Sequence, residues 1–142
     1  MTGYVGDPIL TRKVLDGGIV YTNDIGYIDK DGFVYVLGRK GDVINVGGLK
    51  VSPEEVESAA LGFASIDDCV CVPVDDCITG KALKLLVVVH GGGELDKRAL
   101  VESLKARLES YKVPHIFAAV DKIERTYNGK VNRRYYRNIA VI

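Results

Sequence analysis

The stretch Gly38–Glu57, GRKGDVINVGGLKVSPEEVE, organises the fold that the sequence predicts. It opens with a polar elbow, Gly38–Asp42, which leads into an apolar, β-branched run, Val43–Val46. A Gly47-Gly48 pair then turns the chain into a second short apolar segment, so the pattern predicts a β-hairpin. A loose elbow followed by a rigid hairpin is what a movable domain boundary would need, so our hypothesis is that the stretch forms such a boundary.

A strong helix start follows the hairpin. Ser52 is a capping residue type, Pro53 suits the first helical position, and Glu55 stands where it can close a capping box. The apolar residues that follow recur on one face of a helix. We therefore predict a helix over Ser52–Leu61.

Composition limits the classes of function. The 142 residues are 47% hydrophobic and 27% charged, which is typical of a globular protein. Lys+Arg and Asp+Glu are both 19, so there is no basic excess of the kind that nucleic-acid binding requires. No apolar run approaches the ~20 residues of a membrane span. Because the N-terminus, MTGYVGDPIL, lacks the basic and apolar regions of a secretion signal, we expect a cytoplasmic protein.

Three cysteines, Cys69, Cys71 and Cys77, give an odd count. Cys69 and Cys71 would lie on one face of a strand, where a disulfide is unfavourable. A metal site would need further ligands, and only His90 and His115 are available, so we predict no metal site. All three thiols are expected to be reduced and buried in the core.

The chain divides into a short and a long part. Residues 1–40 start irregularly and then show short apolar runs at 19–21, 26–29 and 33–37, with a turn at 29–32. This part is too small to bury a core alone. It resembles the edge of something larger.

Residues 41–142 have the pattern of a self-sufficient domain. Strands are predicted at 68–74, 83–90 and 116–123, and a second helix is predicted to start at Asp96 and to end near Pro114. Two helices against a mostly antiparallel three-stranded sheet, together with the hairpin, give an α+β fold class.

Motif logic alone gives little chemistry. The sequence has no nucleophile elbow, no Walker-type phosphate loop and no zinc spacing. Lys130 follows an Asn-Gly turn, so its ammonium would sit at a loop tip and could serve phosphate or carboxylate oxygens. A solvated basic tail over 130–137 explains the same residues. Arg39, Lys40 and Lys50 are likewise open to both interpretations.

Five motifs occur in order along the chain: Met1-x-Gly3-Tyr4, Tyr21–Gly26, Gly38–Glu57, Tyr111–Pro114 and Asn128–Arg133. Together they resemble the C-terminal third of adenylate-forming enzymes, which include acyl-CoA synthetases, luciferases and peptide-synthetase adenylation domains. The resemblance covers nearly the whole chain. It implies that residues 1–40 are a β-rich remnant of the large N-terminal domain and that residues 41–142 are the mobile C-terminal domain.

The resemblance also implies roles for single residues in acyl-AMP formation. Asp24 would bind the ribose hydroxyls of ATP, and Arg39 would contact the nucleotide. Lys130 would contact the acyl carboxylate and the α-phosphate, where a fixed cation lowers the repulsion between two approaching anions.

Other residues would serve thioester formation. Gly47, Gly48 and Lys50 lie on the hairpin along which the pantetheine arm of CoA would run, and Gly41 is at the hinge about which the domain swings between the two half-reactions. Glycine replaces the usual Asp, Lys or Ser at the hinge, and its permissive backbone suits a pivot.

Further departures from the family pattern lie at Asn23, Glu124 and Asn128. Asn23 replaces a glycine and is expected to tolerate left-handed backbone. Glu124 replaces a common proline and is expected to loosen the lysine loop, and Asn128 replaces Ser or Thr.

The resemblance implies an ATP-dependent acyl-CoA ligase, with ATP, Mg²⁺ and CoA used by the intact enzyme. The large N-terminal domain of such an enzyme is missing from these 142 residues, so this part alone is expected to be inactive. We expect a fatty acid as the substrate, although the acid pocket would lie in the missing domain. A carrier-protein thiol as acceptor, or a non-catalytic binding module, are the alternatives.

Overall fold

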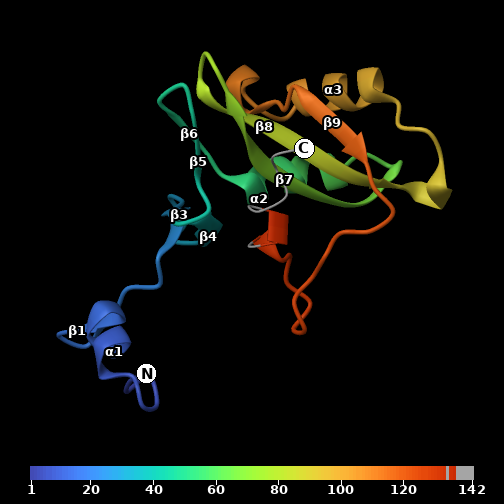
Figure 1. Ribbon diagram of the computed structural model, residues 1–142. Coiled ribbons are helices and arrows are strands. Elements are labelled where there is room, and N and C mark those ends of the chain that lie inside the picture. Colours follow the sequence, from blue (N-terminus) through green and yellow to red (C-terminus); the bar gives the residue numbers. More distant parts are fainter. Residues whose placement is uncertain (134, 137–142) are drawn as a thin grey trace. The chain divides into compact units, whose positions relative to one another are not determined.

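The computed structural model describes residues 1–133 and 135–136 and divides into two compact units, Met1–Gly41 and Asp42–Ile142 (Figure 1). The boundary lies one residue from the predicted one, next to Gly41. Arg134 and Arg137, which belong to the predicted basic tail, lie outside the described residues.

The first unit consists of one short helix and two β-hairpins. Its elements are α1 (Pro8–Val14), β1 (Leu15–Asp16), β2 (Ile19–Val20), β3 (Asp24–Ile28) and β4 (Val34–Arg39). Strand β1 pairs with β2, and β3 pairs with β4, both antiparallel. None of the residues 1–41 is buried, although many are large and apolar. This unit therefore has no core of its own.

Local side-chain contacts stabilise the start of α1 and the β3–β4 turn of this unit. The Asp7 carboxylate accepts a hydrogen bond from the Leu10 N–H at 2.8 Å and so caps the start of α1. In the β3–β4 turn, the Asp29 carboxylate accepts from the N–H of Phe33 at 2.9 Å, and Gly32 has φ +87°. The predicted turn at 29–32 is confirmed.

The second unit is built on a three-stranded sheet in the order β7-β8-β9, with β7 (Ile66–Asp76), β8 (Gly80–Val89) and β9 (Ile116–Ala119). Strands β7 and β8 pair antiparallel over nearly their whole length, whereas β8 and β9 pair parallel. The α+β fold class is confirmed. The last strand is shorter than predicted and ends at Ala119 rather than Ile123.

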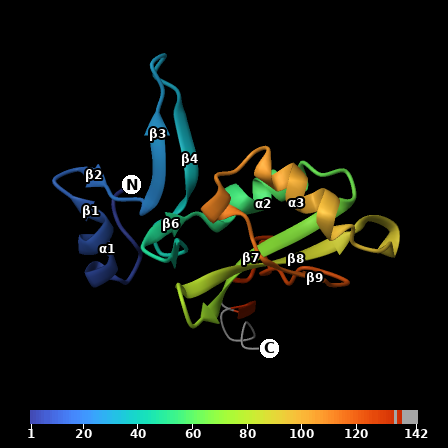
Figure 2. The same ribbon diagram turned by 90° about the horizontal axis from the view of Figure 1, so that it is seen from above.

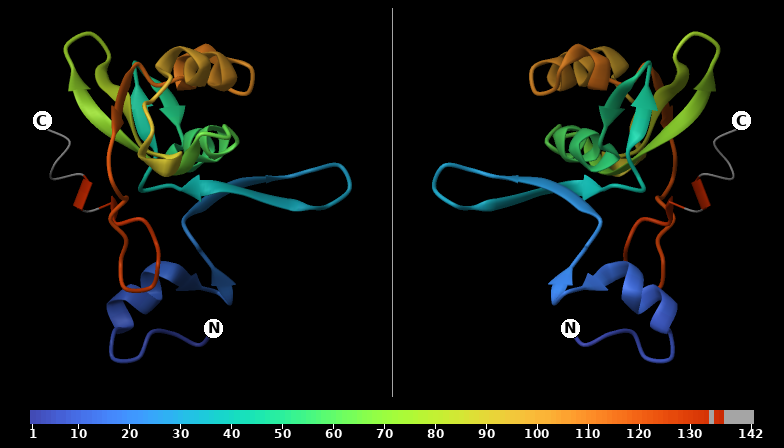
Figure 3. Two further views of the ribbon diagram at one scale, coloured as in Figure 1. Left: turned by 90° about the vertical axis from the view of Figure 1, so that its right-hand side faces the viewer. Right: turned by 90° about the vertical axis from the view of Figure 1, so that its left-hand side faces the viewer.

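Helices α2 (Pro53–Leu61) and α3 (Lys97–Lys105) cover one face of this sheet (Figure 2). Their buried apolar residues pack against alternate residues of β7 and β8, which include Cys69 and Cys71. The residues between them, Val70 and Val72, face the other side and pack with Ile123 and Tyr136. Figure 3 shows the two helices on one side of the sheet and the red segment near the C-terminus on the other.

Cys77 corrects the prediction that all three thiols are buried, because it is exposed in the β7–β8 turn. The apolar alternation that buries Cys69 and Cys71 ends before this turn. Burial raises the pKa of Cys69 to about 12, and the nearby Glu57 and Asp68 carboxylates act in the same direction.

The caps of the two helices differ. At α3 the Asp96 carboxylate accepts from the Ala99 N–H at 3.0 Å, as predicted. The predicted capping box at α2 is wrong: the Ser52 hydroxyl donates to Glu54, and Glu55 forms an ion pair with Lys112 at 2.8 Å. Glu55 therefore points toward Lys112 and not back toward Ser52.

The chain beyond α3 also differs from the prediction. Helix α3 ends at Lys105 rather than near Pro114, and a separate 3₁₀ turn, η2 (Ser110–Lys112), follows. Hydrogen bonds to Glu109 and Glu55 raise the pKa of Lys112 and tie η2 to α2. Another 3₁₀ turn, η1 (His90–Gly92), ends β8.

The hairpin predicted at the centre of the sequence consists of β5 (Ile44–Val46) and β6 (Leu49–Val51). Gly47 and Gly48 form its turn with φ +57° and +90°, the left-handed values that a two-residue hairpin of this type requires. The Gly47 N–H donates to the carbonyl of Thr79 at 3.1 Å. This bond docks the turn on the β7–β8 loop.

Candidate functional site

The predicted site residues fall into two groups, one in each unit. Asp24 and Arg39 belong to Met1–Gly41, whereas Lys130 and the hairpin around Gly48 belong to Asp42–Ile142.

The structure brings the two predicted nucleotide-binding residues together. Asp24 begins β3 and Arg39 ends β4, and the two are cross-strand partners. The Arg39 Nε atom lies 2.8 Å from Oδ1 of Asp24, with 57% and 30% of the side chains exposed. The guanidinium also donates to the Thr22 carbonyl at 2.9 Å. The exposed carboxylate is thereby held in one orientation.

Asn23, which directly precedes β3, has φ +60°, so the expected left-handed conformation is confirmed. Its carbonyl accepts from the Lys40 N–H at 2.8 Å, and the Thr22 hydroxyl oxygen accepts from the Asp24 N–H at 3.2 Å. The backbone before Asp24 is thus fixed to the end of β4.

Lys130 lies at the end of a tight, exposed loop that starts at Arg125. The Gly129 N–H donates to the Thr126 carbonyl at 2.9 Å, and the Lys130 carbonyl accepts from the Thr126 N–H at 2.7 Å. Gly129 has φ +81°, which favours glycine at this place. The Lys130 side chain is exposed and makes no ion pair with the residues that the structure describes. Hydrogen bonds thus hold the backbone of the loop, while the exposed Lys130 ammonium can bind a ligand.

The base of the loop is closed by Glu124, which sequence reasoning expected to loosen it. The Glu124 N–H donates to the Tyr136 hydroxyl at 2.7 Å, and its carbonyl accepts from the Asn132 N–H at 2.9 Å. A proline at this position could not donate the first of these bonds. Asn128 also contributes, because its side chain contacts the Thr126 hydroxyl.

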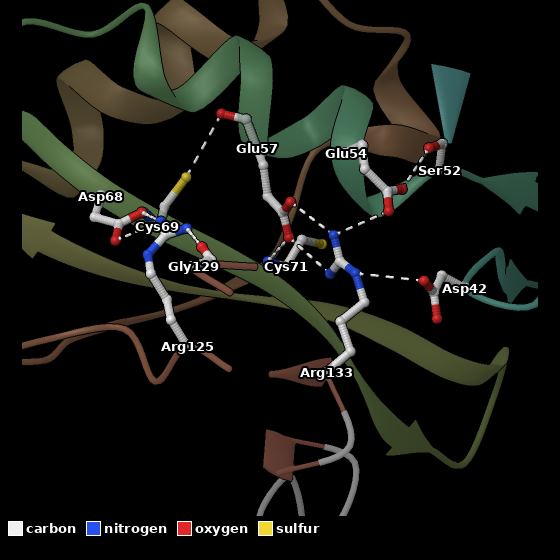
Figure 4. A network of polar contacts seen from close by, with 10 residues as sticks. All are labelled: Asp42, Ser52, Glu54, Glu57, Asp68, Cys69, Cys71, Arg125, Gly129 and Arg133. Carbon is white, nitrogen blue, oxygen red and sulfur yellow. Dashed lines mark hydrogen bonds and ion pairs between the residues drawn. The ribbon is translucent and has the colours of Figure 1, made fainter. Parts of the chain in front are cut away.

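Arg125 connects the loop to the sheet (Figure 4). Its Nη1 donates to the Gly129 carbonyl at 2.9 Å, and its Nη2 lies 2.7 and 2.8 Å from the two carboxylate oxygens of Asp68 on β7. The Cys69 N–H donates to the same carboxylate at 2.9 Å. Sequence reasoning did not single out either Arg125 or Asp68.

Arg133, three residues after Lys130, makes a second and more buried set of contacts. It bonds Glu57 of α2 through two pairs of atoms, at 2.9 and 2.8 Å, and Glu54 at 3.1 Å. Its Nε lies 3.6 Å from Asp42, the first residue of this unit. Only 18% of the Arg133 side chain and 11% of the Glu57 side chain are exposed. Arg133 is thus part of the structure and not a solvated tail residue.

The Glu57 carboxylate also satisfies the edge of the sheet. Strand β7 is an edge strand, and the Cys71 N–H donates to Oε1 of Glu57 at 2.8 Å instead of to another strand. Burial raises the pKa of Glu57, an effect that the Arg133 guanidinium and the Cys71 N–H oppose. In the sequence, the relevant signal is that Glu54 and Glu57 stand three residues apart and so share one face of the predicted helix.

The hairpin presents an open, unobstructed turn. A Cβ placed on Gly48 would meet no atom within 4 Å, and Lys50 on β6 is exposed. A Cβ on Gly47 would instead contact the Thr79 side chain at 3.6 Å. Gly41 is exposed and has no left-handed φ, so its backbone in this structure is one that any residue could adopt.

A family model described as "AMP-binding enzyme C-terminal domain" matches residues 55–130. The chain belongs to this family. The predicted resemblance to adenylate-forming enzymes is therefore confirmed, and the match ends on the predicted catalytic residue, Lys130.

Relatives of this AMP-binding domain are CoA ligases. The chain is 37% identical over 134 residues to a long-chain-fatty-acid–CoA ligase of Bacillus subtilis (strain 168), covering 94% of this chain and 24% of the relative. It is 34% identical over 137 residues to a 2-succinylbenzoate–CoA ligase of Geobacillus sp. (strain WCH70), covering 96% and 28%. The chain spans about a quarter of the length of these relatives.

A solved structure shares the fold. The o-succinylbenzoate CoA synthetase of Bacillus subtilis, in complex with its acyl-adenylate intermediate OSB-AMP, superposes with a TM-score of 0.88 at 30% identity. That match covers 94% of this chain and 27% of the synthetase.

Two further observations concern metals and membranes. Within residues 1–133 and 135–136, no group of three or more His, Cys, Asp or Glu side chains is arranged to hold a metal ion. In the same residues no helix is both long and apolar enough to cross a membrane.

Proposed function

We propose that this AMP-binding domain is the C-terminal part of an ATP-dependent acyl-CoA ligase. In the first half-reaction a carboxylate oxygen of the acid attacks the α-phosphorus of ATP, which forms acyl-AMP and releases pyrophosphate. In the second, the thiol sulfur of CoA attacks the acyl carbon, loses its proton, and AMP leaves with the bonding electrons.

The observation that carries this proposal is the Lys130 loop, whose backbone is fixed while its ammonium is exposed. A preorganised cation lowers the cost of bringing a carboxylate and a phosphate together, because no reorganisation is needed as negative charge accumulates. Lys130 is therefore assigned to the first half-reaction.

The Asp24–Arg39 pair is assigned to the nucleotide. Arg39 engages Oδ1 of Asp24, which leaves Oδ2 for the ribose hydroxyls. The guanidinium, more than half exposed, can serve a phosphate or the ribose at the same time. The described residues do not form a metal cluster, so Mg²⁺ would be held by the ATP phosphates and the large domain, and no step is assigned to it.

The hairpin is assigned to the second half-reaction. The open space at Gly48 would admit the pantetheine arm along the backbone, with Gly47 and Lys50 on either side. Gly41 is assigned to the hinge, because it stands at the boundary between the two units. Rotation at Gly41 would withdraw Lys130 from the active site and bring the hairpin there in its place.

We propose that the partner of this chain is a large N-terminal domain of the same enzyme, because the chain spans about a quarter of the length of its relatives. The unburied apolar residues of Met1–Gly41 support this proposal, because a surface of that size is normally covered. Without the large domain we expect no catalysis, since the acyl pocket would be absent. The cytoplasmic location stays a prediction.

The acid is proposed to be a fatty acid, by analogy with the fatty-acid relative, although the succinylbenzoate relative shows that the family accepts other acids. The test uses the full-length enzyme that contains this chain, with ATP, CoA and a panel of fatty and aryl acids. We expect acyl-CoA, AMP and pyrophosphate in equal amounts. Release of ADP instead of AMP would contradict the proposal.

A second candidate, loading of a carrier-protein thiol, is distinguished by the acceptor. CoA and a holo carrier protein are offered to the same acyl-AMP-loaded enzyme, and thioester formation on CoA is expected. The variant Gly48→Val should slow this step, because the side chain would occupy the open turn and the φ of +90° would strain the hairpin. Pyrophosphate exchange, to which the hairpin is not assigned, should be unchanged.

A further inference from the structure

The loop that carries Lys130 is anchored by its neighbours and not by Lys130 itself. Gly129 directly precedes Lys130, and the Gly129 carbonyl belongs to the same peptide plane as the Lys130 nitrogen. Arg125 donates to this carbonyl at 2.9 Å. The hydrogen bond therefore fixes the plane from which the Lys130 Cα–Cβ bond departs.

The same guanidinium is fixed to the sheet. Both carboxylate oxygens of Asp68 lie within 2.8 Å of Arg125 Nη2, and the Cys69 N–H holds the carboxylate from the other side at 2.9 Å. Asp68 is paired with Val88 in the long β7–β8 ladder. A continuous set of hydrogen bonds thus runs from the sheet through Asp68 and Arg125 to the peptide group before Lys130 (Figure 4).

The other hydrogen bonds of the loop hold the neighbouring peptide groups, and one of them runs from the Gly129 N–H to the Thr126 carbonyl at 2.9 Å. Thr126 holds the carbonyl of Lys130, which lies after its Cα atom, through two contacts at 2.7 and 3.1 Å. Gly129 itself has the backbone freedom of glycine. Among the described residues, Arg125 donates the hydrogen bond to the peptide group between Gly129 and Lys130 itself.

The pair lies near the surface, with 43% and 26% of the Arg125 and Asp68 side chains exposed. An isolated exposed ion pair adds little to folding, but this pair belongs to a network, because Asp68 also accepts from the Cys69 N–H and Arg125 also donates to the Gly129 carbonyl. The network joins the sheet to the peptide next to the predicted catalytic lysine, which supports a positioning role.

We propose that Arg125 and Asp68 are positioning residues for Lys130, needed for acyl-AMP formation and dispensable for thioester formation. The inference rests on the proposed function of Lys130. It predicts that the loss of Arg125 displaces the ammonium, and a displacement of about 1 Å can lower the rate of a catalysed step about 100-fold.

The test measures each half-reaction in the full-length enzyme. Pyrophosphate exchange into ATP reports acyl-AMP formation, and CoA consumption with supplied acyl-AMP reports thioester formation. For Arg125→Gln we expect kcat of the exchange to fall between 10- and 100-fold, on the order of the displacement effect, with thioester formation within about twofold of wild type. Asp68→Asn should show a smaller loss of the same kind, because the amide can still accept one hydrogen bond.

Matched controls come from the same sheet. Asp75 and Lys81 form an exposed ion pair at 2.6 Å on β7 and β8, and the loop of Lys130 makes no contact with them among the interactions of the described residues. Asp75→Asn and Lys81→Gln should leave both half-reactions unchanged. Equal losses in these controls would overturn the inference.

The decisive readout is the combination with Lys130→Ala. If Arg125 acts through Lys130, adding Arg125→Gln to Lys130→Ala causes no further loss of exchange. A further loss equal to that in the wild-type background would overturn the positioning role. If Lys130→Ala alone leaves exchange intact, the proposed function of Lys130 fails.

A tryptic digest of the same proteins tests the geometry without catalysis. Asp68→Asn should speed cleavage after Lys130 relative to Asp75→Asn, because the released loop can enter the protease. Unchanged cleavage would show that Asp68 and Arg125 do not hold the loop. The inference would then be wrong, whatever the two half-reaction assays show.

Discussion

Replacing Arg133 by methionine is expected to destabilise the unit Asp42–Ile142 strongly. Arg133 bonds Glu57 through two pairs of atoms and Glu54 through one, and both Arg133 and Glu57 are largely buried. Arg133→Met leaves two carboxylates side by side, and the Cys71 N–H at 2.8 Å is the donor that Glu57 retains in the described part of the chain.

The size of the effect follows from the burial of Glu57. Removal of one partner of a buried ion pair costs about 3–5 kcal/mol, because the remaining charge stays in a medium of low dielectric constant. We expect about 3 kcal/mol, since 18% of the Arg133 side chain is in contact with water. A domain of this size has about 5–15 kcal/mol of stability in total, so the loss is readily measured.

The loss should depend on pH. Burial raises the pKa of Glu57, and Arg133 opposes this shift, so the variant should raise that pKa further. A carboxyl group whose pKa is higher in the folded state than in the unfolded state binds its proton more tightly when folded, so the stability it contributes is lost as the pH rises. The difference between variant and wild type should therefore be larger at pH 8 than at pH 5.

Urea unfolding followed by far-ultraviolet circular dichroism measures both effects, because the sequence contains no tryptophan for fluorescence. The double variant Arg133→Met/Glu57→Gln is the matched control. Its neutral amide still accepts from the Cys71 N–H, and it should recover most of the loss. A loss below about 1 kcal/mol at pH 8, or an equal loss at both pH values, would refute the reasoning.

Three further predictions concern other parts of the chain. With a thiol reagent at pH 8, the exposed Cys77 should react at once. Cys69 is buried and has a pKa of about 12, so it should react only after the chain unfolds. Rapid labelling of Cys69 in the folded chain would contradict this burial. Gly48→Ala should cost about 1 kcal/mol in urea unfolding because φ is +90°, and Gly41→Ala should change stability by less than about 0.5 kcal/mol; equal losses would count against the turn geometry. A peptide of residues 1–41 should show no protection in hydrogen exchange, since none of its residues is buried, and protection of its β3–β4 amides would disprove this.

The pattern of the sequence predicted most of the elements because local signals and packing agree. Gly47-Gly48 turns the hairpin, Asp96 caps α3, and the apolar alternation of β7 separates Cys69 and Cys71 from Val70 and Val72. Predictions were wrong where a distant charge determined the outcome. Glu55 could not be assigned to Lys112 from the sequence, because 57 residues separate the two.

The candidate site was predicted in part for the same reason. The motifs pointed to Lys130, Asp24 and Arg39, whose roles stay predictions, and the pairing of Asp24 with Arg39 follows from the register of the β3–β4 hairpin. The supports of the lysine loop were missed, because Asp68 is far from Arg125 in sequence, and its role depends on the edge of a sheet that the pattern could not define.

The most direct measurement is pyrophosphate exchange in the full-length enzyme with Lys130→Ala, compared with its conversion of supplied acyl-AMP and CoA into acyl-CoA. The control is Lys122→Ala, which removes an exposed lysine near the base of the same loop. The proposed function predicts that Lys130→Ala lowers exchange by about 100-fold or more, while thioester formation stays within about twofold of wild type. Exchange that survives Lys130→Ala, or an equal loss of both half-reactions, would contradict the role proposed for this domain.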